Sequence, residues 1–83
     1  MEEKTLNLQK LNGILKSVIK ISPDLINDKT SPETAENWDS FNGLMLVTEL
    51  EKGFSVRFTI DEIIAVTCVG DIKDSLRHHG INI

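Results

Sequence analysis

The sequence predicts an all-α fold, a small bundle of three main helices plus one short helix, with a long loop between the first and second main helices. Apolar residues recur at helical spacing in three separate segments. Pro23 and Pro32 interrupt the chain between the first two of these segments, in a polar connection over residues 22–38. One alternating segment, residues 54–58, has no second segment with which to pair as a strand. We therefore expect a single domain, 1–83, without a sheet.

The first helix follows from four leucine and valine residues at positions i, i+3, i+7 and i+10, namely Leu8, Leu11, Leu15 and Val18. Three lysines fall off this stripe, namely Lys10, Lys16 and Lys20. Pro23 is expected to end the helix, because the residue before a proline is driven out of the helical region.

The connection over residues 22–38 is long for so small a domain, and loops of this length are usually functional. We expect Leu25 and Ile26 to anchor it on the core. Trp38 is expected to pack the end of the loop against the bundle. The loop leads directly to Asp39 and Ser40.

The second main helix is expected over residues 40–52. Asp39 can cap its first turn, where a negative charge is also favourable for the helix dipole. Gly53 is expected to close the helix in a left-handed conformation. One face is expected to be apolar and to contribute to the core, and it contains Phe41, Leu44, Val47 and Leu50.

The alternation over residues 54–58 is interpreted as a loop with buried aromatic residues. Thr59 and Glu62 have the spacing of a capping box and predict a short helix that continues to about Val66. The last helix is expected to begin after Thr67 or Cys68 and to end at His78, His79 and Gly80. Its inward residues are expected to be Val69, Ile72 and Leu76.

Composition limits the classes of function. Thirteen acidic residues against nine lysines and arginines leave a net charge of −4, which argues against binding to nucleic acid or to anionic membranes. No segment has the roughly 18 apolar residues of a membrane span, and the amino terminus does not resemble a signal peptide, so we expect a cytoplasmic monomer. Cys68 is the only cysteine, and we interpret it as a small buried apolar residue rather than a metal ligand.

Ser40 allows two interpretations from its position alone. Serine and aspartate are common where a helix begins, because they satisfy free backbone N–H groups. Alternatively, the hydroxyl is exposed and carries a phosphodiester, which the free amides and the dipole of the helix would stabilise.

The segment Trp38-Asp39-Ser40-Phe41 resembles the Asp-Ser-Leu attachment motif of the acyl carrier protein family. The resemblance continues without gaps over Leu46-Val47, Leu50-Glu51, Phe54, Asp61-Glu62 and Thr67-x-Val69, and so covers nearly the whole chain. It implies a non-catalytic carrier of fatty acid, polyketide or specialised lipid biosynthesis. On this basis Ser40 would receive 4'-phosphopantetheine from coenzyme A through a phosphopantetheinyl transferase. Asp39 would shape the helix start and help the transferase to approach through a metal ion.

The sequence departs from the family pattern in its second helix. Phe41 replaces the usual leucine, and Asn42, Met45 and Lys52 stand where acidic residues are common in this helix, whereas Glu51 remains. One interpretation is neutral drift. The other is that the partners, which are acyl-loading and acyl-transferring enzymes, contact Met45 through an apolar surface.

The resemblance also implies that the core can part between the second and third helices to shelter an acyl chain. We expect Leu44 and Ile63 to flank that groove.

Three alternatives remain open at this stage. An aminoacyl or peptidyl carrier loaded by an adenylating enzyme would share the same motif. A small hydrolase with Ser40 as nucleophile is disfavoured, because the sequence has no Gly-x-Ser-x-Gly turn. An unmodified helical adaptor would use Ser40 only as a cap.

Overall fold

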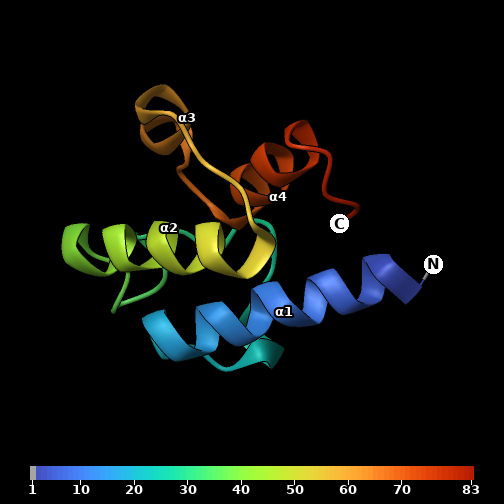
Figure 1. Cartoon of the computed structure of the whole chain (residues 1–83). Coiled ribbons are helices and arrows are strands. Elements are labelled where there is room, and N and C mark those ends of the chain that lie inside the picture. Colours follow the sequence, from blue (N-terminus) through green and yellow to red (C-terminus); the bar gives the residue numbers. More distant parts are fainter. Residues whose placement is uncertain (1) are drawn as a thin grey trace.

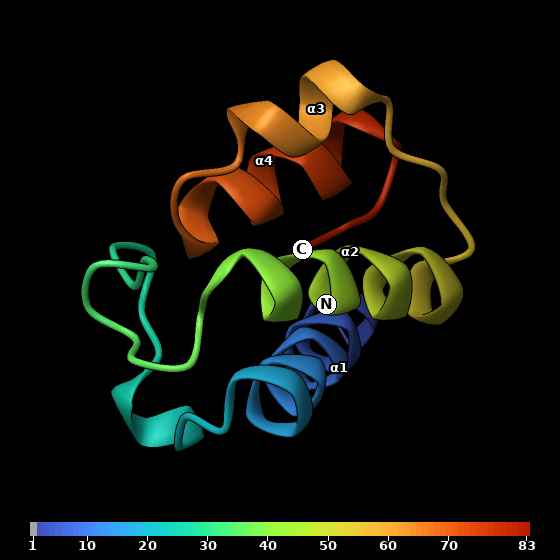
Figure 2. The ribbon, with the colours of Figure 1, turned by 90° about the vertical axis from the view of Figure 1, so that its left-hand side faces the viewer.

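The computed structural model describes residues 2–83. It contains α1 (Glu2–Ile19), a short 3-10 helix (Pro23–Leu25), α2 (Ser40–Phe54), α3 (Ile60–Ala65) and α4 (Val69–His78) (Figure 1). No strand occurs among the described residues, so the predicted all-α fold of three main helices and one short helix is confirmed. Figures 1 and 2 show α2 in the middle, with α1 on one side and α3 and α4 on the other.

The core lies where α1, α2 and α4 meet. Leu11, Leu15 and Ile19 of α1 are almost fully buried, and so are Val69, Ile72 and Leu76 of α4, as the sequence predicts for all but Ile19. Leu8 and Val18 pack at the edge of the core. From α2 the buried residues are Leu46, Leu50 and Phe54.

Two helix ends differ from the predictions. The first helix stops at Ile19, where Lys20 adopts a positive φ of 62°, and Pro23 begins the 3-10 helix instead of ending α1. The second helix continues to Phe54, and Ser55 takes the left-handed position that was expected of Gly53. A Cβ at Gly53 would lie 3.1 Å from Ile14 Cδ1, so the glycine permits α1 and α2 to approach closely.

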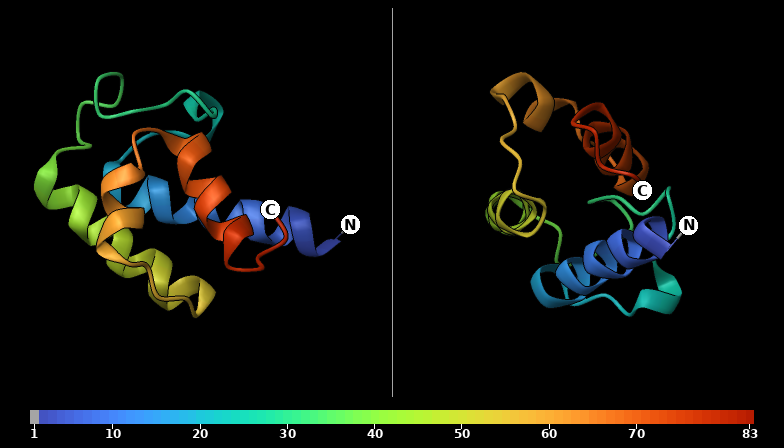
Figure 3. Two further views of the ribbon diagram at one scale, coloured as in Figure 1. Left: turned by 90° about the horizontal axis from the view of Figure 1, so that it is seen from above. Right: turned by 45° about the vertical axis from the view of Figure 1, so that its right-hand side comes forward.

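The connection between α1 and α2 runs around the outside of the helices (Figure 3) and is anchored differently from the prediction. Leu25 is 68% exposed, so its expected place in the core is wrong, whereas Ile26 does pack against the core. The 3-10 helix leaves Leu25 on its solvent side. The principal anchors are Ala35 and Trp38, both buried, and the predicted packing of Trp38 is confirmed.

The loop also supplies the cap of α4. The carbonyl oxygens of Thr30 and Asp28 accept hydrogen bonds from the N–H groups of Val69 and Gly70, at 2.8 and 2.9 Å. Cys68 occupies the N-cap position without a side-chain cap bond, since these carbonyls satisfy the first amides of the helix. A 2.6 Å ion pair between Lys73 and Asp28 secures the same junction and lowers the pKa of the Asp28 carboxyl.

The segment between α2 and α3 is a loop, as predicted, with Phe58 half-buried; Phe54, which was expected in this loop, is instead the buried last residue of α2. The Glu51 carboxylate accepts a hydrogen bond from Phe58 N at 2.9 Å and holds the loop against α2. The capping box at the start of α3 is confirmed, because Thr59 and Glu62 bond each other's backbone N–H groups. These contacts fix where α3 lies relative to α2.

Candidate functional site

Ser40 is the first residue of α2 and is exposed. Asp39 before it is the N-cap, with extended backbone, and its Oδ1 accepts a hydrogen bond from Asn42 N at 2.8 Å. Asn42 in turn donates from Nδ2 to the carbonyl of Asn37 at 2.7 Å, which ties the end of the loop to the first turn of the helix. Capping is therefore carried by Asp39, and the Ser40 hydroxyl is available to solvent.

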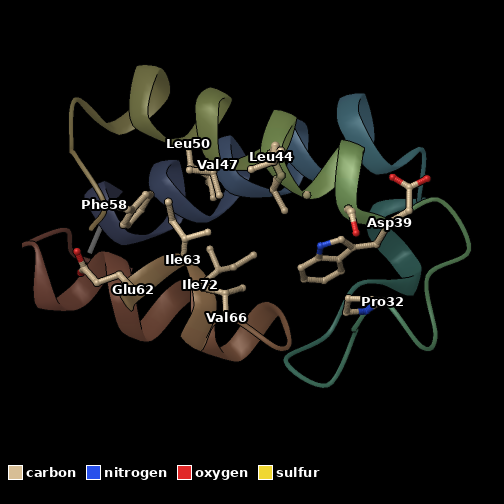
Figure 4. Close-up of a pocket in the computed structure, with 14 residues that line it drawn as sticks. Pro32, Asp39, Leu44, Val47, Leu50, Phe58, Glu62, Ile63, Val66 and Ile72 are labelled. Atoms are coloured by element: carbon tan, nitrogen blue, oxygen red, sulfur yellow. The ribbon is translucent and has the colours of Figure 1, made fainter. Parts of the chain in front are cut away.

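A cavity of about 520 Å³ begins at Ser40 and lies between α2 and α3. Figure 4 shows Asp39 and Pro32 at one end, and Phe58 and Glu62 at the other. Three apolar residues of α2, namely Leu44, Val47 and Leu50, face Ile63 of α3 and Val66, the residue that follows α3. Leu44 and Ile63, expected to flank a groove, both line this cavity. Such a volume is within the range of small-molecule sites.

The cavity also includes residues that the sequence did not single out for this site. Pro32 and Trp38 come from the long loop and form part of the end near Ser40. Ile72 of α4 lies at its floor among the buried core residues.

The outward side of α2 is apolar near Ser40. Phe41 is 71% exposed, Leu44 63% and Met45 45%, and on α3 Ile60 and Ile64 are also exposed. The expectation that Phe41 and Leu44 belong to the core is wrong. The buried side of α2 follows Leu46, Leu50 and Phe54 at four-residue spacing, which leaves Phe41 on the opposite side and Leu44 beside the cavity, outside the core.

Glu51 lies far from Ser40 along the same helix. Eleven residues at 1.5 Å each separate the two by about 16 Å. Its carboxylate is half-buried against the Phe58 backbone. The structure thus gives Glu51 a role in holding the α2–α3 loop.

Glu62 and His79 form the polar boundary at the far end of the cavity. The Glu62 carboxylate receives a hydrogen bond from Thr59 N, and His79 Nε2 lies 2.7 Å from its other oxygen. The bond from the Thr59 backbone is the main cause of a lowered Glu62 pKa, with His79 adding to it. The ring of His79 also packs edge-on against Phe58. This cluster joins α3 to the end of α4.

Cys68 is half-buried at the start of α4, not fully buried as the sequence analysis expected. His78 and His79 close α4 as predicted, followed by Gly80 with a φ of 87°. None of the described helices has an apolar stretch long enough to cross a membrane.

No model of a known protein family matches the sequence, and no curated protein matches it either.

Proposed function

We propose that this protein is an acyl carrier protein, which holds acyl intermediates as thioesters on a 4'-phosphopantetheine arm attached to Ser40. It presents them to partner enzymes of fatty acid, polyketide or specialised lipid biosynthesis. One observation carries the proposal: an exposed serine at the start of a helix opens directly onto an apolar cavity.

The attachment requires only that the Ser40 hydroxyl be reachable by a transferase. Its oxygen forms a bond to the β-phosphorus of coenzyme A, the pyrophosphate bond breaks, and adenosine 3',5'-bisphosphate leaves. The hydroxyl proton passes to a base of the transferase. The chain supplies the exposed hydroxyl and a helix start whose partial positive charge favours the phosphodiester.

The residues around Ser40 fit the arm. Asp39 bonds the Asn42 amide and so holds the first turn in place. Asp39 is itself exposed, which suits the role of metal-mediated contact with the transferase that the family resemblance implies. The arm brings the reactive thiol, and the protein contributes position and shelter.

The cavity favours an acyl cargo over an aminoacyl one. Its two facing walls are made of aliphatic side chains, which exclude water from an alkyl chain, and the Glu62 carboxylate at its far end is already bonded to Thr59 N and His79. An aminoacyl or peptidyl carrier remains the alternative, and loading by an adenylating enzyme would identify it.

Attachment is tested by incubation of the protein with coenzyme A and a broad-specificity transferase, followed by intact mass measurement. The wild type is expected to gain one phosphopantetheine, and Ser40→Ala none. Ser17→Ala, which removes an exposed serine of α1, is the matched control and should be modified normally. A wild type that gains no mass beside a loaded reference carrier would refute the proposal.

Shelter of the cargo is tested by loading a medium-length acyl chain and recording amide and methyl chemical shifts. Changes are expected at Leu44, Val47, Ile63 and Val66, which line the cavity. Changes confined to the arm and to the first turn of α2 would show that the chain stays in solvent.

A further inference from the structure

Trp38 combines deep burial with an unused hydrogen-bond donor. Its side chain is only 6% exposed. The indole N–H can donate but cannot accept, and within the described chain no hydrogen bond reaches it. The N–H is therefore free to donate to a ligand.

The indole nitrogen is not sealed in the core. No side-chain nitrogen or oxygen of the described residues is both fully enclosed and unpaired, so Nε1 must reach an accessible surface. Trp38 lines the same cavity as Asp39 and Ser40.

The edge of the ring that carries the N–H faces the first turn of α2. A Cβ built on Gly43 would lie 3.7 Å from Trp38 Nε1 and 3.9 Å from Cδ1. Gly43 is three residues after Ser40, on the same side of the helix, and also lines the cavity. The absence of a side chain at Gly43 leaves the approach to the N–H free.

Two further donors meet at this end of the helix. The Asp39 side chain accepts a hydrogen bond from the Asn42 N–H, and the Asp39 carbonyl oxygen accepts one from the Gly43 N–H. The N–H groups of Ser40 and Phe41 have no acceptor within residues 2–83. Free amides at a helix amino terminus attract an anion, and the buried indole N–H adds a donor from the side.

We propose that Trp38 Nε1–H donates a hydrogen bond to a non-bridging oxygen of the phosphate esterified to Ser40. The proposal rests on the proposed function, because the phosphate arrives with the arm. The bond draws the phosphodiester toward the cavity entrance and so directs the arm along the cavity. Trp38 is in this sense a positioning residue for the arm.

The test uses the fact that the chain has a single tryptophan, whose indole N–H gives one assignable signal in a ¹⁵N correlation spectrum. On conversion of the apo protein to the phosphopantetheinylated form, we expect this signal to move downfield. Its exchange with solvent should slow about tenfold, as a bond to a charged acceptor would cause. Ser40→Ala, treated identically, cannot carry the arm and should show neither change. If its indole signal also moves, the change comes from coenzyme A that is not covalently attached, and the proposal is wrong.

Variants at positions 38 and 43 provide a second measurement. Trp38→Phe removes the N–H and keeps an aromatic ring, so the ³¹P signal of its phosphodiester should differ from that of the wild type. If this variant does not fold, Gly43→Ala replaces it. The added Cβ makes only ordinary contact with the indole and should reduce the downfield shift by obstructing the N–H.

The outcomes separate the two proposals. No added mass refutes the carrier function. Added mass with an unmoved indole signal, or with a ³¹P signal insensitive to the change at position 38 or 43, overturns the role of Trp38 and leaves the carrier function standing.

Discussion

His79 Nε2 lies 2.7 Å from Glu62 Oε2, and this contact joins the end of α4 to the first turn of α3. Both side chains are mostly covered, at 25% and 21% exposure, and Ser75 Oγ lies 3.4 Å from the same carboxylate oxygen. Since Glu62 also lines the cavity, the contact sets the position of the wall that α3 contributes.

The Glu62 contact predicts a dependence of stability on acid. The folded-state pKa of Glu62 is lowered, so its contribution is present above its ordinary pKa and is lost as the pH falls through the lower, folded value. Glu62→Gln preserves the capping box, because glutamine also serves at this position. We expect the variant to be less stable than wild type at neutral pH, with the difference shrinking below about pH 4. Thermal unfolding at a series of pH values measures this.

Asp61→Asn is the control for that experiment, because it removes an exposed carboxylate from the neighbouring position. Below neutral pH, the unfolding temperature of this variant should change with pH in parallel with that of the wild type. A Glu62→Gln curve parallel to both would show that the carboxylate does not stabilise the fold.

Gly70 and Gly13 should respond in opposite directions to alanine. A Cβ at Gly70 would lie 3.2 Å from the Asp28 carbonyl oxygen, a backbone atom that caps α4. We expect Gly70→Ala to cost about 1–2 kcal/mol of unfolding free energy. A Cβ at Gly13 meets nothing within 4 Å, and Gly13→Ala in the middle of α1 should gain about 0.5–1 kcal/mol. Urea unfolding of both variants measures the difference, and a neutral Gly70→Ala would refute the backbone cap.

Met45 should matter to partner enzymes and not to folding. Its side chain is 45% exposed beside the exposed Phe41 and Leu44, one turn from Ser40. We expect Met45→Glu to reduce the rate of acyl transfer with a cognate enzyme by about tenfold, because a charge would then be desolvated at the contact. Leu6→Glu, at an exposed position of α1, is the control. Equal kinetics for Met45→Glu and the wild type would refute the apolar contact.

Filling the cavity should remove the stabilisation that a bound acyl chain gives to the protein. The wild type loaded with a medium-length acyl chain is expected to melt at a higher temperature than its unloaded form, because the chain adds buried apolar surface. Val47→Phe places an aromatic ring in the cavity between α2 and α3 and should abolish this increase in melting temperature. Ile64→Phe, on the exposed side of α3, should preserve it. An increase retained in Val47→Phe would place the chain elsewhere.

Local signals allowed much of the fold to be predicted. The leucine spacing of α1 and α4, the Asp39 cap and the Thr59–Glu62 capping box all depend on residues within a turn or two of each other. The predicted end of α2 was wrong, because Gly53 does not form the turn that ends the helix. It instead leaves room for Ile14 of α1 to pack closely against α2. Leu25 was misplaced for a similar reason, since the orientation of an irregular loop depends on the surface on which it docks.

The amino-acid sequence by itself determined that the chain is helical, where most of its helices begin, and that Ser40 follows a capping aspartate. Only the tertiary structure decided that Ser40 opens onto a cavity, that Phe41 faces solvent while Leu44 lines that cavity, and that the Trp38 N–H has no partner among residues 2–83. Helix starts are set by hydrogen bonds between near neighbours in the chain. A cavity and an unpaired donor depend on how the loop, α2 and α3 pack together, and side-chain spacing along one helix carries no information about that packing.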